Sequence, residues 1–371
     1  MLFLIFIITY ALLILMVTMA MNLLIFPKLK KENPSVDAPF VSVLIPARNE
    51  AKVIEASVKN LLKQTYTKYE LIILDDNSED NTGEIALDAG QGDKRLRVIS
   101  GLDLPNGWMG KSWACHNLAQ SAKGDILIFT DADVQWAEDA LNSIIIEMQR
   151  SQVDMLTVWS TQITKTFAER ITVPLMGMVI LGYIPTVMVH QSPFSLFAAA
   201  NGQLMAWRKP VYDAIEGHKA VANNVLDDVT LARVAKKNGY KIRMVDGNEQ
   251  IKTRMYDSWQ SVRDGYAKNI LAGYGSVPAL LLGIVFHWLL FIVPYALLFI
   301  AEYRLFGVIL IIAGLTLRTV SAIFTKQRVL DALWMPLTVI LFTLISFRSI
   351  YWHYTGKVTW KGRTLTKDRQ V

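Results

Sequence analysis

The sequence predicts an α/β domain with a mostly parallel sheet, joined at both ends to apolar helices. Two observations lead to this class. Over the middle of the chain, apolar strand-like segments alternate with amphipathic helical segments, which is typical of βαβ units. The chain of 371 residues also has 52% hydrophobic residues, more than a soluble protein usually has. Because the middle has ordinary mixed composition, the hydrophobic excess must lie at the ends.

The first 26 residues predict a transmembrane helix. Residues 1–26 carry no charged side chain and are long enough to cross a hydrocarbon core of about 30 Å. A cleaved signal peptide is the alternative, but no basic region precedes the run and no small-residue cleavage site follows it. Lys28, Lys30 and Lys31 follow the run, so the positive-inside rule predicts that residues 27–275 form a cytoplasmic domain on the cell (inner) membrane.

The C-terminal part predicts a membrane region of about three helices over residues 276–354. Its apolar blocks span roughly residues 277–300, 305–324 and 332–354. Three crossings would leave the tail, residues 355–371, outside, whereas the basic charge of that tail favours the inside. We therefore expect one C-terminal block to be re-entrant.

Between these ends we expect six strands with helices between them. The strand segments are residues 40–46, 69–75, 96–100, 125–130, 154–160 and 241–245, and the helices lie within residues 50–65, 83–90, 112–124 and 227–238. In parallel sheets, ligands bind beyond the carboxyl ends of the strands, where the polar clusters of this chain also lie. The apolar, proline-broken segment 167–194 is expected to form interfacial helices, because a crossing there would divide the domain.

The clearest polar cluster is the pair Asp131 and Asp133, which follows a buried strand. If the chain stays extended there, residues i and i+2 point the same way and the two carboxylates converge. Convergent carboxylates suit Mg²⁺ or Mn²⁺. We expect Asp133 to bind the metal directly and Asp131 to face a nucleotide as well; two solvated turn aspartates are the alternative.

Three other clusters have both a structural and a functional interpretation. Asp75 and Asp76 can accept the ring N–H of a uracil or cap the next helix. Lys111 lies before a helix, where it can meet a diphosphate or remain solvated. Asp227 and Asp228 open a helix, where they favour the helix dipole or provide a general base.

Several function classes are excluded or disfavoured. Neither a G-x-G-x-x-G nor a G-x-x-x-x-G-K-[ST] motif occurs, which counts against a dinucleotide dehydrogenase and a P-loop NTPase. No basic run with interleaved aromatics indicates nucleic-acid binding, so the net charge of +6 is attributed to the membrane surface. The single cysteine, Cys115, excludes an internal disulfide and a cysteine-based zinc site.

Taken together, "PARNE", "LDDNS", "DADV" and "LDD" resemble the inverting family 2 glycosyltransferases of the GT-A fold. The segments "GKSWAC", "ITKTF", "RMY", "GYAKN" and "WKGR" are similar to the membrane-bound branch that contains carotenoid glycosyltransferases. The resemblance implies a GT-A (Rossmann-like) sheet domain and transfer of a hexose from a UDP-sugar to a hydroxyl, less readily a carboxyl, of a membrane lipid. It also implies Mg²⁺ or Mn²⁺ as cofactor and no nucleic-acid partner.

The resemblance assigns roles to residues of this chain. The nucleotide would contact Pro46, Ala47, Arg48, Glu50, Asp75, Asp76, Lys111 and Asp131, and the metal would bind Asp133 and Asp131. Asp228 would be the base, with Asp227 beside it, and the leaving-group or acceptor region would contain Asn201, Gly202, Gln203, Arg254, Gln260 and Arg263. The family's Q-x-x-R-W motif appears at best as Gln260 to Asp264, so Arg254 competes with Arg263 for its role.

Other functions stay open. A polyprenyl-phosphate, hopanoid or ceramide-type lipid glycosyltransferase fits the same motifs. A processive polysaccharide synthase is disfavoured by the few membrane segments, and a nucleotidyltransferase by the missing glycine-rich nucleotide loop. A non-catalytic nucleotide-binding membrane protein is disfavoured, because it would not need all of the acidic pairs described above. Because a carboxylic acid is already ionised at pH 7, the intact acids favour a hydroxyl-bearing acceptor.

Overall fold

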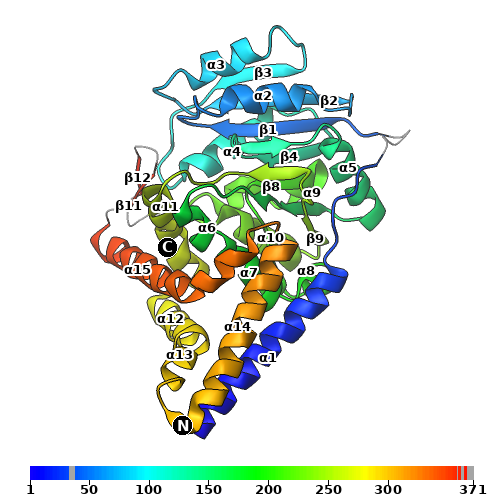
Figure 1. The fold of residues 1–371 in the computed structure, drawn as a ribbon. Helices are drawn as coiled ribbons and strands as arrows, with labels where there is room; N and C mark the ends of the chain where they lie inside the picture. The colour runs from blue at the N-terminus through cyan, green and yellow to red at the C-terminus, as the bar shows by residue number, and fades with distance from the viewer. Residues whose placement is uncertain (33–37, 357, 361–362, 366–371) are drawn as a thin grey trace. The chain divides into compact units, whose positions relative to one another are not determined.

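The computed structural model describes residues 1–32, 38–356, 358–360 and 363–365 (Figure 1). The chain divides into two compact units, which we describe separately. The helical unit comprises Met1–Phe26, Gln162–Val187 and Met255–Val358. The sheet unit comprises Pro27–Thr161, Met188–Arg254 and Thr359–Val371. Most of the predicted basic tail lies outside the described residues.

The sheet unit is built on seven strands in the order β3-β2-β1-β4-β8-β6-β9. The strands are β1 (Val41–Ala47), β2 (Tyr69–Asp75), β3 (Leu96–Ser100), β4 (Ile126–Thr130), β6 (Met155–Trp159), β8 (Leu204–Arg208) and β9 (Ile242–Asp246). Every pairing is parallel except those of β8, which runs antiparallel to both β4 and β6. The predicted mostly parallel sheet is therefore confirmed.

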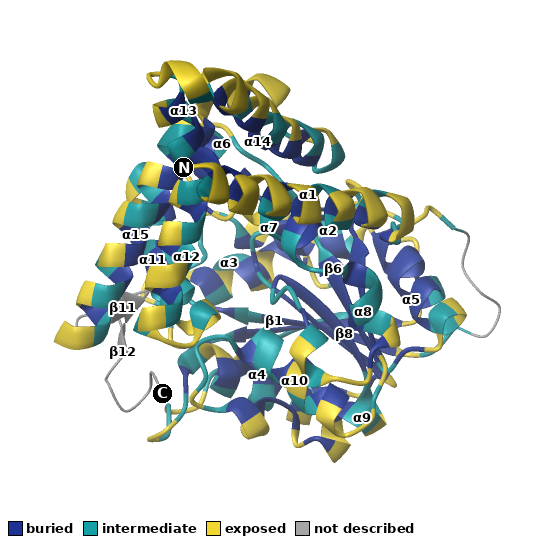
Figure 2. Ribbon diagram, turned by 90° about the horizontal axis from the view of Figure 1, so that it is seen from below, coloured by how far each residue is buried: buried dark blue, intermediate teal, exposed yellow. Residues whose placement is uncertain are grey.

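Helices cover both faces of this sheet. They are α2 (Ile54–Leu62), α3 (Thr82–Ala89), α4 (Gly110–Ser121), α5 (Ala140–Ser151), α9 (Lys209–Ala214), η2 (Gly217–Val221) and α10 (Asp227–Lys237). Ile54, Val58 and Leu61 of α2 belong to the same core as Ile144 of α5 and the sheet residue Ile73. Figure 2 shows α4, α9 and α10 on the opposite side of the sheet from α2 and α5.

Two smaller sheets and one main strand are absent from the sequence prediction. The short strands are β5 (Val134–Trp136), β7 (Thr161–Gln162), β10 (Ile251–Thr253), β11 (Val358–Trp360) and β12 (Arg363–Leu365). The missed main strand is β8. Its residues Leu204 to Trp207 are all buried, but five apolar or amphipathic residues after an apolar segment do not by themselves distinguish a strand from a helix.

The helical unit contains the apolar ends of the chain. Its elements are α1 (Leu2–Ile25), α6 (Phe167–Thr172), α7 (Pro174–Tyr183), α11 (Trp259–Tyr274), α12 (Val277–Phe291), α13 (Val293–Leu297), η3 (Ala301–Tyr303), α14 (Arg304–Phe324), η4 (Val329–Trp334) and α15 (Met335–Thr355). The stretches Leu2–Ile25, Ala301–Phe324 and Val329–Thr355 are long and apolar enough to cross a membrane. A bend of 108° separates α11 from α12.

Within the helical unit, α1 and α14 lie side by side, and their C-terminal ends meet. The rings of Phe26 and Phe324 are stacked there, with centroids 6.1 Å apart. Helix α15 points in a different direction from α1 and α14 in both views (Figures 1 and 2) and packs against α11 and α12. The three long apolar helices therefore do not share one direction.

Segment 167–194 forms short helices, and the break after α7 is held by a buried asparagine of α1. Asn22 Nδ2 donates to the carbonyls of Leu181 (2.8 Å) and Ile184 (2.7 Å). Its Oδ1 accepts hydrogen bonds from the backbone N–H (2.9 Å) and hydroxyl (2.8 Å) of Thr186. All four bonds compensate for an amide that is fully buried in an apolar helix.

We predict that Asn22→Leu destabilises the helical unit by about 2 kcal/mol, since it leaves buried carbonyls of Leu181 and Ile184 without these donors. Thermal unfolding in a fixed detergent measures the effect. Thr9→Ala is the matched control, because Thr9 makes only a local bond to the Ile5 carbonyl of its own helix. Equal melting temperatures for the two variants would contradict the role of Asn22.

Candidate active site

The predicted polar residues lie at one edge of the sheet, where β1, β2 and β4 end and β8 begins. Ala47 at the end of β1 pairs with Asp75 at the end of β2. Thr130 at the end of β4 pairs with Leu204 at the start of β8. Because β8 is antiparallel, residues 201–203 lie at the edge where the parallel strands end. This edge is where α/β sheets bind ligands.

The Asp131 and Asp133 pair lies in a turn and does not extend the strand. Val134 N–H donates to the Asp131 carbonyl at 3.3 Å, and Asp131 N–H donates to the Gln203 carbonyl at 3.2 Å. The prediction of an extended chain at this point is wrong, because the chain turns here to enter β5. The carboxylates nevertheless act on each other. Desolvation, followed by the charges of Asp131 and Glu50, raises the pKa of Asp133 to about 7.

This acidic turn fits a divalent cation whose coordination shell is completed by water and by a bound ligand. Among the described residues, no group of three or more His, Cys, Asp or Glu side chains is arranged to hold a metal ion. Mg²⁺ and Mn²⁺, however, usually take one or two carboxylates and complete their shells with water and phosphate oxygens. The two neighbouring carboxylates of Asp131 and Asp133 provide hard oxygen donors that match that requirement.

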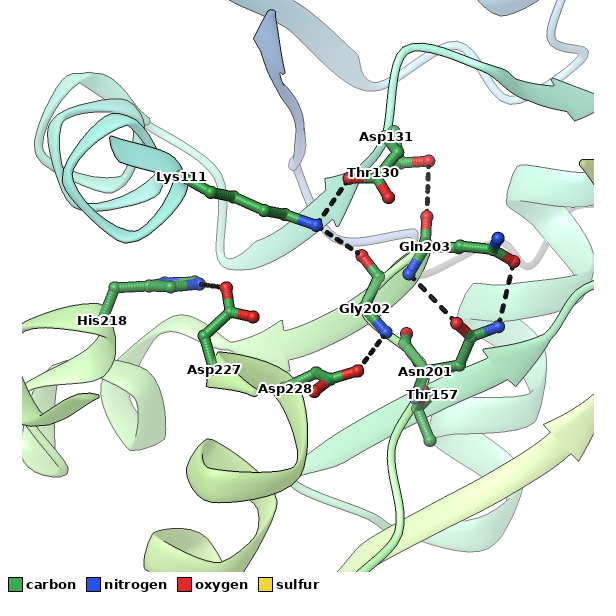
Figure 3. Close-up of polar contacts among 10 residues, drawn as sticks. All are labelled: Lys111, Thr130, Asp131, Thr157, Asn201, Gly202, Gln203, His218, Asp227 and Asp228. Atoms are coloured by element: carbon green, nitrogen blue, oxygen red, sulfur yellow. Dashed lines mark hydrogen bonds and ion pairs between the residues drawn. The ribbon is translucent and has the colours of Figure 1, made fainter. Parts of the chain in front are cut away.

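Lys111, at the start of α4, points at this turn (Figure 3). Its Nζ donates to Asp131 Oδ1 at 2.7 Å and to the Gly202 carbonyl at 3.4 Å. Desolvation acts to lower the pKa of Lys111, but the charges of Asp131 and Asp227 outweigh it and raise the pKa above its usual range. The structure thus holds a permanent positive charge beside the carboxylates.

Asp228, in the first turn of α10, is fixed by two backbone donors. Gly202 N–H donates to Oδ2 at 2.8 Å and Val229 N–H to Oδ1 at 2.7 Å. Desolvation and the charge of Asp227 raise the pKa of Asp228 to about 6. A Cβ at Gly202 would lie 3.1 Å from Asp228 Oδ2, so glycine permits the close approach. The result is an oriented carboxylate with raised basicity, suited to accept a proton near neutral pH.

The main chain at residues 201–203 connects the acidic turn to Asp228. The Gly202 carbonyl faces Lys111 and its N–H faces Asp228 (Figure 3). We call residues 201–203 the Gly202 strip. Asn201 holds it in place: its N–H donates to Thr157 Oγ1 (2.8 Å), and its Nδ2 donates to the Val158 carbonyl (3.1 Å). Sequence analysis placed residues 201–203 in an acceptor region, and the structure shows them as the link between the two acidic sites.

Tyr212 and His218 complete the surroundings of Asp227, and sequence analysis missed both. His218 is fully buried in η2, and its Nε2 lies 3.8 Å from Asp227 Oδ2. Tyr212 OH lies 2.8 Å from His218 Nδ1. A single histidine without a spaced partner gives no motif, so only the packing of α9, η2 and α10 identifies it.

The first two strand ends form a tightly hydrogen-bonded turn. Arg48 Nη1 donates to the carbonyls of Asp76 (2.6 Å) and Asn77 (2.8 Å). Ser78 N–H donates to Asp75 Oδ1 at 3.1 Å, and Asp76 N–H donates to the Ala47 carbonyl at 2.8 Å. In this state Arg48 and Asp75 stabilise the turn itself. Their contact with a nucleotide, like that of Pro46 and Glu50, stays a prediction.

The three C-terminal residues predicted for the leaving-group or acceptor region, Arg254, Gln260 and Arg263, do not belong to the same unit. Arg254 belongs to the sheet unit and follows β10, whereas Gln260 and Arg263 lie on α11 of the helical unit. Arg263 Nε donates to Asp264 Oδ1 at 2.8 Å, and Arg348 Nε of α15 donates to the same oxygen at 2.7 Å. Arg263 is therefore engaged in an ion-pair network within the helical unit.

Comparison with known proteins finds similar sequences. Residues 42–200 match the sequence model of Glycosyl transferase family 2. The chain is 28% identical over 276 residues to 4,4'-diaponeurosporenoate glycosyltransferase of Staphylococcus haemolyticus, covering 72% of this chain and 70% of that protein. It is 26% identical over 375 residues to the protein of the same name from Staphylococcus aureus, covering 95% and 96%.

A solved structure has the same fold. It is a mannosyltransferase from Pyrobaculum calidifontis in complex with GDP-Man and Mn²⁺, with a TM-score of 0.58 and 16% identity over 94% of this chain and 98% of that one. The matched segment 42–200 contains β1, β2, β4 and the Asp131–Asp133 turn. The chain therefore has a GT-A fold, its residues 42–200 resemble the family 2 glycosyltransferases, and it is similar over most of its length to proteins named 4,4'-diaponeurosporenoate glycosyltransferase.

Proposed function

We propose that the protein is an inverting, metal-dependent hexosyltransferase that moves a sugar from UDP to a hydroxyl of a membrane lipid, such as a carotenoid or another isoprenoid. The observation that carries the proposal is the Gly202 strip. It places Lys111 and the acidic turn on one side and the Asp228 carboxylate on the other. A sugar bound between them would meet a leaving-group site and a base at the same time.

On the donor side, Asp131 and Asp133 would hold the divalent ion and Lys111 would contact the diphosphate. The ion, when bound, supplies positive charge that stabilises the negative charge developing on the leaving UDP. Lys111 adds a fixed ammonium to the same region. Support for a divalent ion comes from the carboxylate pair and from the Mn²⁺ named in the structure from Pyrobaculum calidifontis. UDP as the donor nucleotide follows from the family resemblance at Asp75 and Asp76.

On the acceptor side, Asp228 would take the hydroxyl proton as the oxygen attacks the anomeric carbon. Attack from the face opposite the leaving UDP inverts the configuration. The backbone donors at Gly202 and Val229 fix the carboxylate, and its raised pKa makes it a stronger base than an exposed aspartate. Asp227 contributes to that basicity through its charge.

A carboxyl acceptor is the second candidate, because the relatives are named for 4,4'-diaponeurosporenoate, a carboxylate. A carboxylate is ionised at neutral pH and needs no base. The two candidates therefore differ in product and in base dependence. A glycosyl ester is cleaved by mild alkali, whereas a glycoside is stable to it.

We further propose that the sheet unit is cytoplasmic and that α15 lies along the membrane surface. Lys28, Lys30 and Lys31 support the first statement by the positive-inside rule. The second is supported by the direction of α15, which differs from that of α1 and α14 (Figure 1). Crossings by α1, α12–α13 and α14 would then leave the C-terminus on the cytoplasmic side. Protease removal of a C-terminal tag from inverted vesicles, but not from intact spheroplasts, is the expected result.

The function is tested by incubating purified protein with a panel of UDP-sugars and GDP-sugars and total membrane lipid, with and without Mn²⁺, and identifying new glycolipids by mass spectrometry. We expect one hexose to be transferred in a Mn²⁺- or Mg²⁺-dependent way, to a product stable to mild alkali. UDP release without any glycolipid would indicate hydrolysis only. Transfer from GDP-sugars alone would contradict the proposed donor.

The pH dependence of transfer follows from Asp228. A base works only when it is deprotonated, and the folded-state pKa of Asp228 is about 6. Transfer to a hydroxyl should therefore fall about tenfold for each pH unit below about 6, measured as kcat between pH 5 and pH 8. At saturating Mn²⁺, which keeps Asp133 deprotonated, a flat profile over that range would favour a carboxylate acceptor. Thermal unfolding at each pH controls for loss of fold.

A further inference from the structure

The buried side chains of Tyr212 and His218 have no role in the chemistry derived above, yet they end at the Asp227 carboxylate. His218 is 0% exposed, and its ring packs edge-on against Phe129 of β4 at a centroid distance of 4.9 Å. Phe129 also contacts the ring of Tyr212 at 5.3 Å. The imidazole is thus held in place by the strand that leads to the acidic turn.

The hydrogen bonds of this pair determine where the imidazole proton lies. His218 donates its backbone N–H to Tyr212 OH at 3.1 Å, and Tyr212 OH lies 2.8 Å from His218 Nδ1. Burial lowers the pKa of His218 to about 4, so at neutral pH the ring carries a single N–H. Because Nε2 faces a carboxylate, which only accepts, the proton belongs on Nε2 and Tyr212 donates to Nδ1.

The remaining gap is unusual for two buried polar atoms. Neither His218 Nε2 nor Asp227 Oδ2 has a hydrogen-bond partner among the described residues, although they face each other at 3.8 Å. Buried donors and acceptors are normally paired. Hydrogen bonds at catalytic sites are often long without substrate and shorten when it binds.

We propose that Tyr212 and His218 are positioning residues that hold the Asp227 carboxylate beside Asp228, and that the His218–Asp227 contact closes to a hydrogen bond when substrates bind. The inference rests on the proposed function, since it concerns the base of that reaction. The charged or titratable groups that act on Asp227 are His218 on η2, Tyr212 on α9, Lys111 and Cys115 on α4, and Asp228 on α10 itself. Without the His218 donor, Asp227 can turn toward Lys111, and its repulsion of Asp228 weakens.

The experiment compares His218→Leu, His218→Gln and Tyr212→Phe in the transfer assay. His218→Leu removes the donor and should lower kcat about 10- to 100-fold, as expected for a hydrogen bond to a charged group. It should also move the acid limb of the pH profile to lower pH. His218→Gln keeps an N–H at a similar reach and should stay within about threefold of wild type, while Tyr212→Phe should lose about three- to tenfold.

A double-mutant cycle separates positioning from general damage. In an Asp227→Asn background, His218→Leu should cost nothing further, because its target is gone. Additive losses, or an unmoved acid limb in both His218→Leu and Tyr212→Phe, would overturn the inference. His190→Leu is the matched control, since this half-buried histidine lies outside the site, with its Nδ1 3.4 Å from the Ile242 carbonyl. If His218→Leu does not fold, the rates and pH profiles of Tyr212→Phe and His218→Gln test the inference instead.

A second readout does not depend on activity. In protein labelled with ¹⁵N-histidine, the His218 resonance, assigned by its loss in His218→Gln, should report the Nε2–H form. The Nδ1–H form would overturn the inference even in an inactive protein. An inactive wild type with the Nε2–H form would instead contradict the proposed function and leave the geometry supported.

Discussion

Replacing Asp228 by asparagine should lower kcat for transfer to a lipid hydroxyl by about 10²- to 10⁴-fold, the contribution expected of a general base. Asparagine keeps the size, and its single carbonyl oxygen can still accept from one of the two backbone donors, Gly202 or Val229, so the fold and donor binding should persist. The measurement is kcat with the lipid acceptor, together with UDP binding by calorimetry. Loss of rate with unchanged UDP affinity is the expected pattern.

The matched control for Asp228→Asn is Asp213→Asn. Asp213 is an exposed aspartate on α9 whose carboxylate pairs with Lys209 at 3.6 Å, and it should be replaced with little change in rate. Retention of most activity in Asp228→Asn would remove the residue from the role of base. It would also favour a carboxylate acceptor if the product proves to be labile to alkali.

Replacing Asp133 by asparagine should lower kcat by about 10²- to 10³-fold, the range of several kcal/mol that a bound metal supplies. Asparagine removes the charge that holds the cation but leaves the turn between β4 and β5. Wild-type activity should disappear on chelation and return with Mn²⁺ or Mg²⁺. The variant should lose this response, as measured by a titration of activity against metal concentration.

Asp125 provides the control at the other end of the same strand. It precedes β4, and its Oδ2 accepts from the Phe40 N–H at 3.1 Å, away from the acidic turn. Asp125→Asn should keep wild-type metal dependence. If Asp133→Asn keeps it as well, the pair does not bind the metal and Lys111 alone would serve the diphosphate.

Much of the fold was predictable because the segments carry their own periodicity. The strands β1, β2, β4 and β6 are apolar runs followed by turns, and α2 has a clear apolar stripe. The acidic residues that follow β2 and β4 were predicted to share a site because parallel strands bring their carboxyl ends to one edge. Long uncharged runs likewise mark membrane-compatible helices from composition alone.

The antiparallel strand β8 was not predictable in the same way. Its partners β4 and β6 are distant in sequence, and only their register brings Gly202 between Lys111 and Asp228. The chain direction after Thr130 was predicted wrongly for a similar reason. A local pattern of alternating residues does not reveal the backbone bond from Asp131 to the Gln203 carbonyl.

By itself, therefore, the sequence determined the class of the domain, the apolar ends and the positions of Asp131, Asp133 and Asp228, because these depend on composition and local spacing. The tertiary structure alone decided which groups share a site. The Gly202 strip, the ion pair of Lys111 with Asp131 and the approach of His218 to Asp227 join segments that are separated along the chain. Such contacts depend on strand order and helix packing, which local sequence patterns do not encode.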